Sequence, residues 1–123
     1  MQQPILISVV DDDVSSRESL PDLLQTFGLA ATTFKSAEEF LLSDALGDTR
    51  CLILDVAMPG MSGPQLQREL KRRGWKTPIV FITALRDQEL RAKLLAEGAV
   101  DCLFKPFSEH DMRSALHHAL GIA

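Results

Sequence analysis

Five short apolar runs alternate with five amphipathic stretches in this chain, and that alternation constrains the fold more than any other feature. The apolar runs span residues 5–10, 30–34, 51–54, 78–82 and 102–104. The first run is apolar almost without interruption, which is typical of a strand buried on both faces. Strict alternation of strands and helices predicts an α/β fold, with a parallel sheet between two helix layers and right-handed crossovers. We therefore predict a single doubly wound domain with a five-stranded sheet and five helices.

Capping residues predict where several helices begin. Ser15 and Glu18 have the spacing of a capping box, and so do Ser36 and Glu39. Asp87 is a suitable N-cap for the fourth helix. We expect the first helix to begin at Ser15.

The composition fits one compact soluble domain. Hydrophobic residues make up 46% of the 123 residues and charged residues 24%, which distinguishes the chain from disordered or fibrous proteins. The net charge of −4 argues against direct contact with nucleic acid, whose binding depends on clustered Lys and Arg. No apolar run approaches the ~20 residues that span a bilayer. Because Cys51 and Cys102 lie within apolar runs, we expect buried, reduced thiols in a cytoplasmic protein.

Polar side chains follow four of the predicted strands, at the points where the strands end. They are Asp11, Asp12 and Asp13 after the first strand, Asp55 after the third, Thr83 after the fourth and Lys105 after the fifth. In open α/β sheets, ligands bind at the carboxyl ends of the strands. We expect the flavodoxin-like strand order 2-1-3-4-5, in which the third strand lies between the first and the fourth. Asp11, Asp12 and Asp55 are then neighbours.

Three adjacent carboxylates need compensating positive charge. Two carboxylates ~5 Å apart repel by roughly 3 kcal/mol at an effective dielectric constant of ~20. The Lys105 side chain can span most of the ~9.5 Å between the fifth and third strands, so we expect its ammonium near Asp55 rather than against the acidic pair. An oxygen-only site with room for water favours Mg²⁺. A carboxylate beside Mg²⁺, an ammonium and the Thr83 hydroxyl is a constellation for phosphoryl transfer.

These residues resemble the receiver domain of two-component response regulators. The similar motifs are Asp11-Asp12, the run Asp55-x-x-Met58-Pro59-x-x-x-Gly63, Thr83-Ala84, and Gly98-Ala99-x-Asp101 followed by Lys105-Pro106-Phe107. Their order and spacing cover nearly the whole chain. Two further segments, residues 9–13 and 36–41, are most similar to the receivers of FixJ and LuxR-type transcription regulators.

The resemblance implies a role for each matching residue, with Asp55 as the phosphoacceptor. Mg²⁺ is contacted, directly or through water, by Asp11, Asp12, Asp55 and the backbone carbonyl of Ala57. The phosphoryl group is bound by the Thr83 hydroxyl, the Ala84 backbone N–H and Lys105. The resemblance also implies a cis peptide bond before Pro106.

Partners and output also follow from the resemblance. The phosphoryl group comes from the phosphohistidine of a sensor histidine kinase, and the receiver catalyses much of its own phosphorylation and dephosphorylation. Phosphorylation remodels the face formed by the fourth helix, fifth strand and fifth helix, which commonly drives homodimerisation. We expect residues 1–123 to be the N-terminal receiver of a longer regulator, with a DNA-binding effector domain that is not present in this sequence.

One position departs from the family pattern. Strand five usually carries Tyr or Phe where this chain has Cys102, and in the family that ring turns inward as the residue equivalent to Thr83 moves. Phe104 lies on the same face of the strand by period, so we hypothesise that it substitutes. The departure also keeps a second function open: a pseudo-receiver that docks a partner without being phosphorylated.

Two enzyme or carrier classes fit the sequence less well. Phosphatases of the haloacid dehalogenase type carry an Asp-x-Asp motif. In this chain the residue two positions after Asp55 is Ala57, so the second aspartate is missing. A flavin-binding electron carrier needs a phosphate loop after strand one. Three consecutive aspartates there would repel the phosphate.

Overall fold

The computed structural model describes residues 4–122 and contains a five-stranded parallel sheet. The strands are β1 (Leu6–Val10), β2 (Ala30–Phe34), β3 (Cys51–Asp55), β4 (Ile79–Thr83) and β5 (Asp101–Phe104). Their order is β2-β1-β3-β4-β5, which confirms both the fold class and the predicted strand order. The helices are α1 (Val14–Thr26), α2 (Ala37–Leu41), α3 (Gly63–Arg72), α4 (Gln88–Ala96) and α5 (Glu109–Leu120), with a short 3₁₀ helix, η1 (Asp44–Gly47), after α2. Among residues 4–122, no helix has the length and apolar character needed to cross a membrane.

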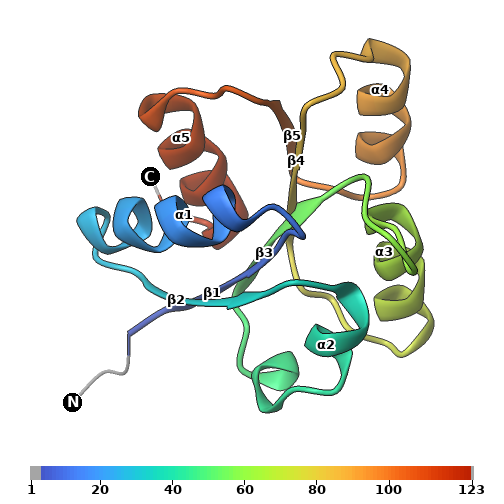
Figure 1. Ribbon diagram of the computed structural model, residues 1–123, viewed down its shortest axis with the longest axis horizontal. Helices are drawn as coiled ribbons and strands as arrows, with labels where there is room; N and C mark the ends of the chain where they lie inside the picture. The colour runs from blue at the N-terminus through green and yellow to red at the C-terminus, as the bar shows by residue number, and fades with distance from the viewer. Residues whose placement is uncertain (1–3, 123) are drawn as a thin grey trace.

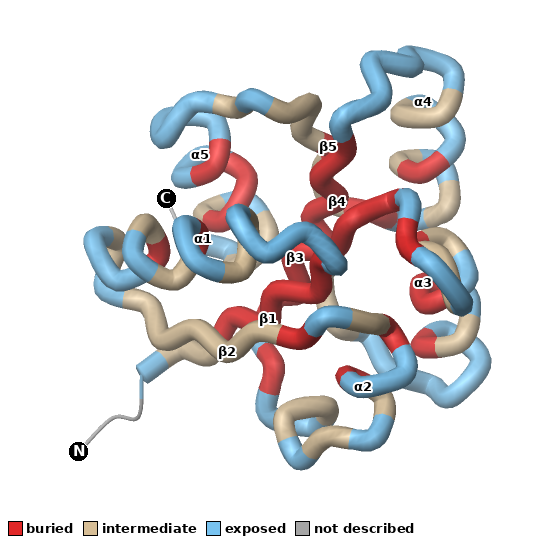
Figure 2. The backbone as a smooth tube through the Cα atoms, viewed as in Figure 1, coloured by how far each residue is buried: buried red, intermediate tan, exposed pale blue. Residues whose placement is uncertain are grey.

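The sheet separates two apolar cores. Helices α1 and α5 cover one face, and α2, α3 and α4 cover the other (Figure 1). All residues of β3 and β4 are buried (Figure 2), because alternate side chains point into opposite cores. Leu52 and Leu54 of β3 join the core beneath α3, whereas Ile53 joins the core beneath α5. Burial on both faces explains why the strand sequences are continuously apolar.

The helix starts follow their capping residues, with one correction. Ser36 accepts a hydrogen bond from the Glu39 backbone N–H at 3.0 Å, as predicted. Helix α1, however, begins at Val14, because the Asp13 carboxylate accepts a hydrogen bond from the Ser15 N–H at 3.0 Å. The predicted start at Ser15 is therefore wrong. A carboxylate caps as well as a hydroxyl and also interacts favourably with the helix dipole, so Asp13 takes the cap.

Both cysteine thiols are free and buried, as predicted. Burial raises the pKa of Cys51 to about 12 and also raises the pKa of Cys102. Both side chains therefore behave as small apolar groups with a protonated thiol.

Candidate functional site

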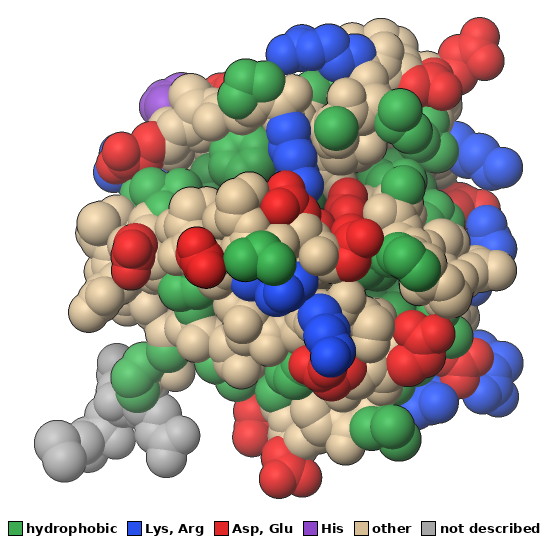
Figure 3. Space-filling model, in the orientation of Figure 1, with side chains coloured by type: hydrophobic (Ala, Val, Ile, Leu, Met, Phe, Trp, Pro, Cys, Tyr) green, Lys and Arg blue, Asp and Glu red, His purple; other side chains and the backbone are tan. Residues whose placement is uncertain are grey.

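The carboxyl ends of β1 and β3 bring three carboxylates together. Asp55 is the last residue of β3, while Asp11 and Asp12 directly follow β1, its neighbour in the sheet. One carboxylate oxygen from each of the three lies within 4.8 Å of the others. Asp11 is completely buried, Asp55 is 8% exposed and Asp12 is exposed. The predicted cluster is confirmed, and acidic side chains gather near the middle of the face in Figure 3.

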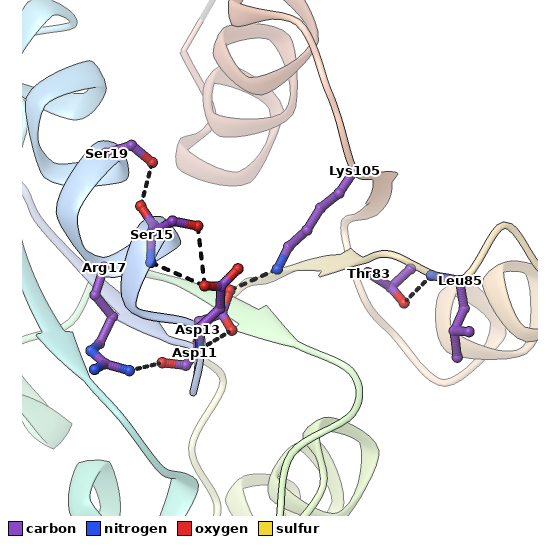
Figure 4. A network of polar contacts seen from close by, with 8 residues as sticks. All are labelled: Asp11, Asp13, Ser15, Arg17, Ser19, Thr83, Leu85 and Lys105. Carbon is purple, nitrogen blue, oxygen red and sulfur yellow. Dashed lines mark hydrogen bonds and ion pairs between the residues drawn. The ribbon is translucent and has the colours of Figure 1, made fainter.

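The loop after β1 is organised by its own backbone and by α1. Oδ1 of Asp11 accepts a hydrogen bond from the Asp13 backbone N–H at 3.0 Å. The guanidinium of Arg17 donates to the backbone carbonyl of Asp11 at 2.9 Å (Figure 4). The sequence did not reveal this role of Arg17, although a signal existed: a basic residue near a helix N-terminus opposes the dipole. Asp13 is the helix cap and lies outside the group of three carboxylates.

Lys105 crosses the site from the end of β5 and binds Asp11. Its ammonium donates to Oδ2 of Asp11 at 2.9 Å (Figure 4). The expectation that the ammonium lies near Asp55 rather than against the acidic pair is therefore wrong. The Asp11 side chain is fully enclosed, so it has no water to solvate its charge and needs a partner more than Asp55 does.

The charged groups of Asp11, Asp55 and Lys105 shift one another's pKa values. Burial opposes ionisation of Asp11, but hydrogen bonds from the Asp13 N–H and Lys105 outweigh it and lower the pKa of Asp11. The pKa of Asp55 is raised to about 7, mainly by burial and secondly by the negative charge of Asp11. Burial also opposes the charge on Lys105, yet its hydrogen bond to Asp11 raises the pKa of the ammonium. Lys105 forms an ion pair with one of the three carboxylates, that of Asp11.

This donor set fits a hard divalent cation. The three side chains offer only oxygen atoms, which Mg²⁺ prefers, and one lysine leaves negative charge for a metal to neutralise. Burial is the main cause of the raised pKa of Asp55, and the negative charge of Asp11 raises this pKa further, as expected where carboxylates outnumber cations. Asp11, Asp12 and Asp55 are therefore the side chains that would hold Mg²⁺.

Thr83 ends β4, next to β5, and its hydroxyl is bound to the loop that follows. Its oxygen accepts a hydrogen bond from the Leu85 backbone N–H at 3.0 Å. Figure 4 shows the Thr83 side chain turned toward Leu85 rather than toward Asp11 and Lys105. Thr83 is buried, whereas Ala84 is exposed. The Lys105–Pro106 peptide bond is cis.

Comparison with known families agrees with this geometry. Residues 7–117 match the model of the response regulator receiver domain. The chain belongs to this family. The receiver is similar to the transcriptional regulatory protein TdiR of Thauera aromatica, with 41% identity over 94% of this chain and 51% of TdiR. It thus spans about half the length of that relative.

Solved structures agree with the assignment. The response regulator StyR superposes with a TM-score of 0.88 at 39% identity, covering 97% of this chain and 60% of StyR. The N-terminal part of FixJ superposes with a TM-score of 0.85 at 33% identity, covering 98% and 96% of the two chains. The similarity to FixJ that the sequence motifs predicted is confirmed.

Strand β5 of this receiver carries Cys102 and Phe104 on the same face. Both belong to the core beneath α3 and α4, with Cys102 buried and Phe104 partly buried at its edge. Arg91 of α4 donates to the Cys102 carbonyl at 3.0 Å and to the Asp101 carboxylate at 2.8 Å. The guanidinium of Arg86 lies 6.0 Å from the centre of the Phe104 ring. Two arginines therefore connect α4 and its preceding loop to β5.

Proposed function

We propose that this receiver accepts a phosphoryl group on Asp55 from the phosphohistidine of a sensor histidine kinase, in a Mg²⁺-dependent reaction. One observation carries the proposal: the Asp55 carboxylate ends a central strand and lies within 4.8 Å of the carboxylates of Asp11 and Asp12. The chemistry of this donor set and the family both support Mg²⁺ as the metal.

In the proposed transfer, an oxygen of Asp55 attacks phosphorus. A P–O bond forms as the P–N bond to the imidazole breaks, and the imidazole nitrogen keeps the electron pair and takes a proton from solvent. When bound, Mg²⁺ supplies positive charge against the carboxylates and the phosphoryl oxygens. The ammonium of Lys105 adds positive charge from the β5 side. The Thr83 hydroxyl and the Ala84 backbone N–H donate to the phosphoryl oxygens, and the Ala57 carbonyl serves as a further metal contact.

Mass spectrometry after incubation with acetyl phosphate and Mg²⁺ tests this proposal. Wild-type protein gains one phosphoryl group, with the carboxylate of Asp55 displacing acetate, and Asp55→Asn gains none. Asp48→Asn is the matched control, because it removes an exposed carboxylate elsewhere on the surface and keeps the adduct. An adduct absent from wild type, or equally present in Asp55→Asn, contradicts the proposal. The former result would favour a pseudo-receiver that only docks a partner.

The output of the switch is a second part of the proposal. We propose that phosphorylation changes the face formed by α4, β5 and α5 and favours a homodimer. Because TdiR is a transcriptional regulator and about twice as long, we further propose that this receiver controls a DNA-binding effector domain and acts in the cytoplasm beside its kinase.

The contacts around Thr83 support a route for this change. If the Thr83 hydroxyl turns to the phosphoryl group, its hydrogen bond with the Leu85 N–H is lost. The neighbouring Arg86 can then leave the Phe104 ring. Phe104 would then respond to the movement of Thr83, as an aromatic residue at the position of Cys102 does in other members of the family.

Truncation of Phe104 tests the readout separately from the chemistry. Phe104→Ala should still form the Asp55 adduct, while sedimentation should detect less phosphorylation-dependent dimer than in wild type. Leu103→Ala, on the opposite face of β5, controls for general loss of packing. Unchanged coupling between phosphorylation and dimerisation in Phe104→Ala excludes this route.

A further inference from the structure

A glutamate on α2 reaches the loop that follows Asp55. Oε2 of Glu38 accepts a hydrogen bond from the backbone N–H of Met61 at 3.1 Å, across 23 positions of sequence. Met61 lies in the segment between β3, which ends at Asp55, and α3. Residues of β3, α3 and α2 share one apolar core. Helix α2 is therefore connected to the loop that continues from the phosphoacceptor.

Gly60 makes room for this carboxylate. A Cβ atom at Gly60 would lie 2.5 Å from Oε2 of Glu38, which is closer than real side chains allow. Gly60 also has φ +75°, in the left-handed region that favours glycine. The loop backbone and the Glu38 side chain therefore fit closely together.

The Glu38 contact is the loop's connection to a neighbouring element. Among the hydrogen bonds of residues 4–122, it alone joins residues 57–62 to an element other than β3 or α3. The ends of the loop are fixed separately, because the Gly63 N–H donates to the Val56 carbonyl at 2.9 Å. Glu38 thus holds the middle of the loop.

We propose that Glu38 is a positioning residue for Mg²⁺ binding. By holding Met61, it keeps residues 57–62 in one conformation and so limits the freedom of the Ala57 carbonyl, the backbone group expected to contact the metal. The inference rests on the proposed function of Asp55. Glu38 acts through the loop and does not itself touch the metal.

Calorimetric titration with Mg²⁺ tests this role in four proteins: wild type, Glu38→Ala, Glu38→Gln and Glu39→Ala. We expect Glu38→Ala to raise the Kd about three- to tenfold, less than the ~10–100-fold typical of groups that bind a metal ligand directly. Glu38→Gln keeps an acceptor oxygen on a side chain of the same length, so its Kd stays within about twofold. Glu39→Ala removes the same charge one residue along α2, and screening keeps its Kd within about twofold.

Amide hydrogen exchange supplies a second readout that does not depend on metal or activity. In Glu38→Ala, the Met61 amide should lose protection while the amides of β3 keep theirs. Equal Kd values for Glu38→Ala and Glu39→Ala overturn the inference. So does a Glu38→Gln protein as weak as Glu38→Ala, because the charge alone would then explain the effect.

The outcomes also separate this inference from the function on which it rests. Wild-type protein that binds no Mg²⁺ and forms no Asp55 adduct overturns both. If wild-type protein binds Mg²⁺ and forms the Asp55 adduct, but Glu38→Ala binds Mg²⁺ with an unchanged Kd, only the role of Glu38 is overturned.

Discussion

The loops after β3 and β4 both border the site, yet they are held in different ways. The β3–α3 loop buries Val56 and Met58, and its middle is bound to Glu38. The β4–α4 loop, residues 84–87, is exposed throughout. Asp87 caps α4. The two residues before it make the hydrogen bond from the Leu85 N–H to Thr83 and the contact of the Arg86 side chain with the Phe104 ring.

This difference separates two tasks. Phosphoryl transfer needs groups that are already in position when the donor arrives, and the packed β3–α3 loop is suited to hold them. A switch needs an element with two accessible arrangements of similar free energy. Residues 84–86 are exposed, and the hydrogen bond from Leu85 to Thr83 and the cation–π contact of Arg86 with Phe104 are weak restraints, so this part of the loop is suited to that second task.

The largest effect should come from filling the space beside Asp55. In Gly63→Ala, the new Cβ would clash with the Asp55 carbonyl oxygen and lie 3.0 Å from the Phe81 ring, so α3 must move. We expect urea titration to give a loss of about 2–4 kcal/mol in the free energy of unfolding. Gly74→Ala is the control: it meets no atom within 4 Å and has φ +83°, so it should cost only about 1 kcal/mol. Equal losses would mean that the β3–α3 loop is not tightly packed.

Metal binding should stabilise the protein next most strongly. Mg²⁺ at about ten times its Kd should raise the free energy of unfolding by about 1.4 kcal/mol, as for any ligand that binds only the folded state. Asp12→Asn should lose most of that gain, because it removes the exposed carboxylate of the cluster. Hydrogen exchange sharpens the comparison: protection by Mg²⁺ should extend to the Met61 amide and leave the Leu85 amide unchanged. If Mg²⁺ instead protected the Leu85 amide and left the Met61 amide unchanged, the metal would order the β4–α4 loop, which would contradict the comparison.

A smaller effect is expected from the β4–α4 loop. Thr83→Val keeps the shape of the side chain but removes the acceptor of the Leu85 N–H. Because that amide can bind water in an exposed loop, we expect a loss of about 0.5–1 kcal/mol in urea titrations. Thr83→Ser keeps the hydroxyl and should retain protection of the Leu85 amide. A loss in Thr83→Val as large as that in Gly63→Ala would remove the distinction between the loops.

The smallest effect should follow Arg86→Gln. Exposed cation–π contacts contribute about 0.5–1 kcal/mol, and the guanidinium lies 6.0 Å from the centre of the Phe104 ring, where we expect the lower value of about 0.5 kcal/mol. Thermal unfolding should therefore barely change. Lys93→Gln, an exposed basic residue later in α4, controls for the lost charge. If the proposed readout is correct, Arg86→Gln alters the dimer fraction without phosphorylation and Lys93→Gln does not. Equal dimer fractions in the two variants would contradict it.

The sequence predicted the sheet and the carboxylate cluster because both follow from local patterns. Apolar runs identify the buried strands, and side chains at the ends of adjacent parallel strands must meet. Ser36 was predictable as a cap for the same reason, since its partner Glu39 is three residues away.

The failures arose where several groups compete for one partner. Asp13 and Ser15 are both good caps, and the carboxylate takes the cap because the helix dipole also favours it. The reach of Lys105 includes more than one carboxylate, and the complete enclosure of Asp11 decides the pairing. The contact between Glu38 and Met61 depends on how α2 packs beside the β3–α3 loop. No local pattern encodes that packing.

The ion pair between Lys105 and Asp11 joins residues 94 positions apart, which has a consequence for synthesis. The three aspartates emerge from the ribosome first, and the chain must grow by about 50 residues after Asp55 before Lys105 follows, roughly 3–10 s at ~5–20 residues per second. Until then a nascent chain holds the carboxylates without their cationic side chain. The charge balance of the site can therefore be completed only after β5 has been translated, and until then the most enclosed carboxylate has no Lys105 with which to pair.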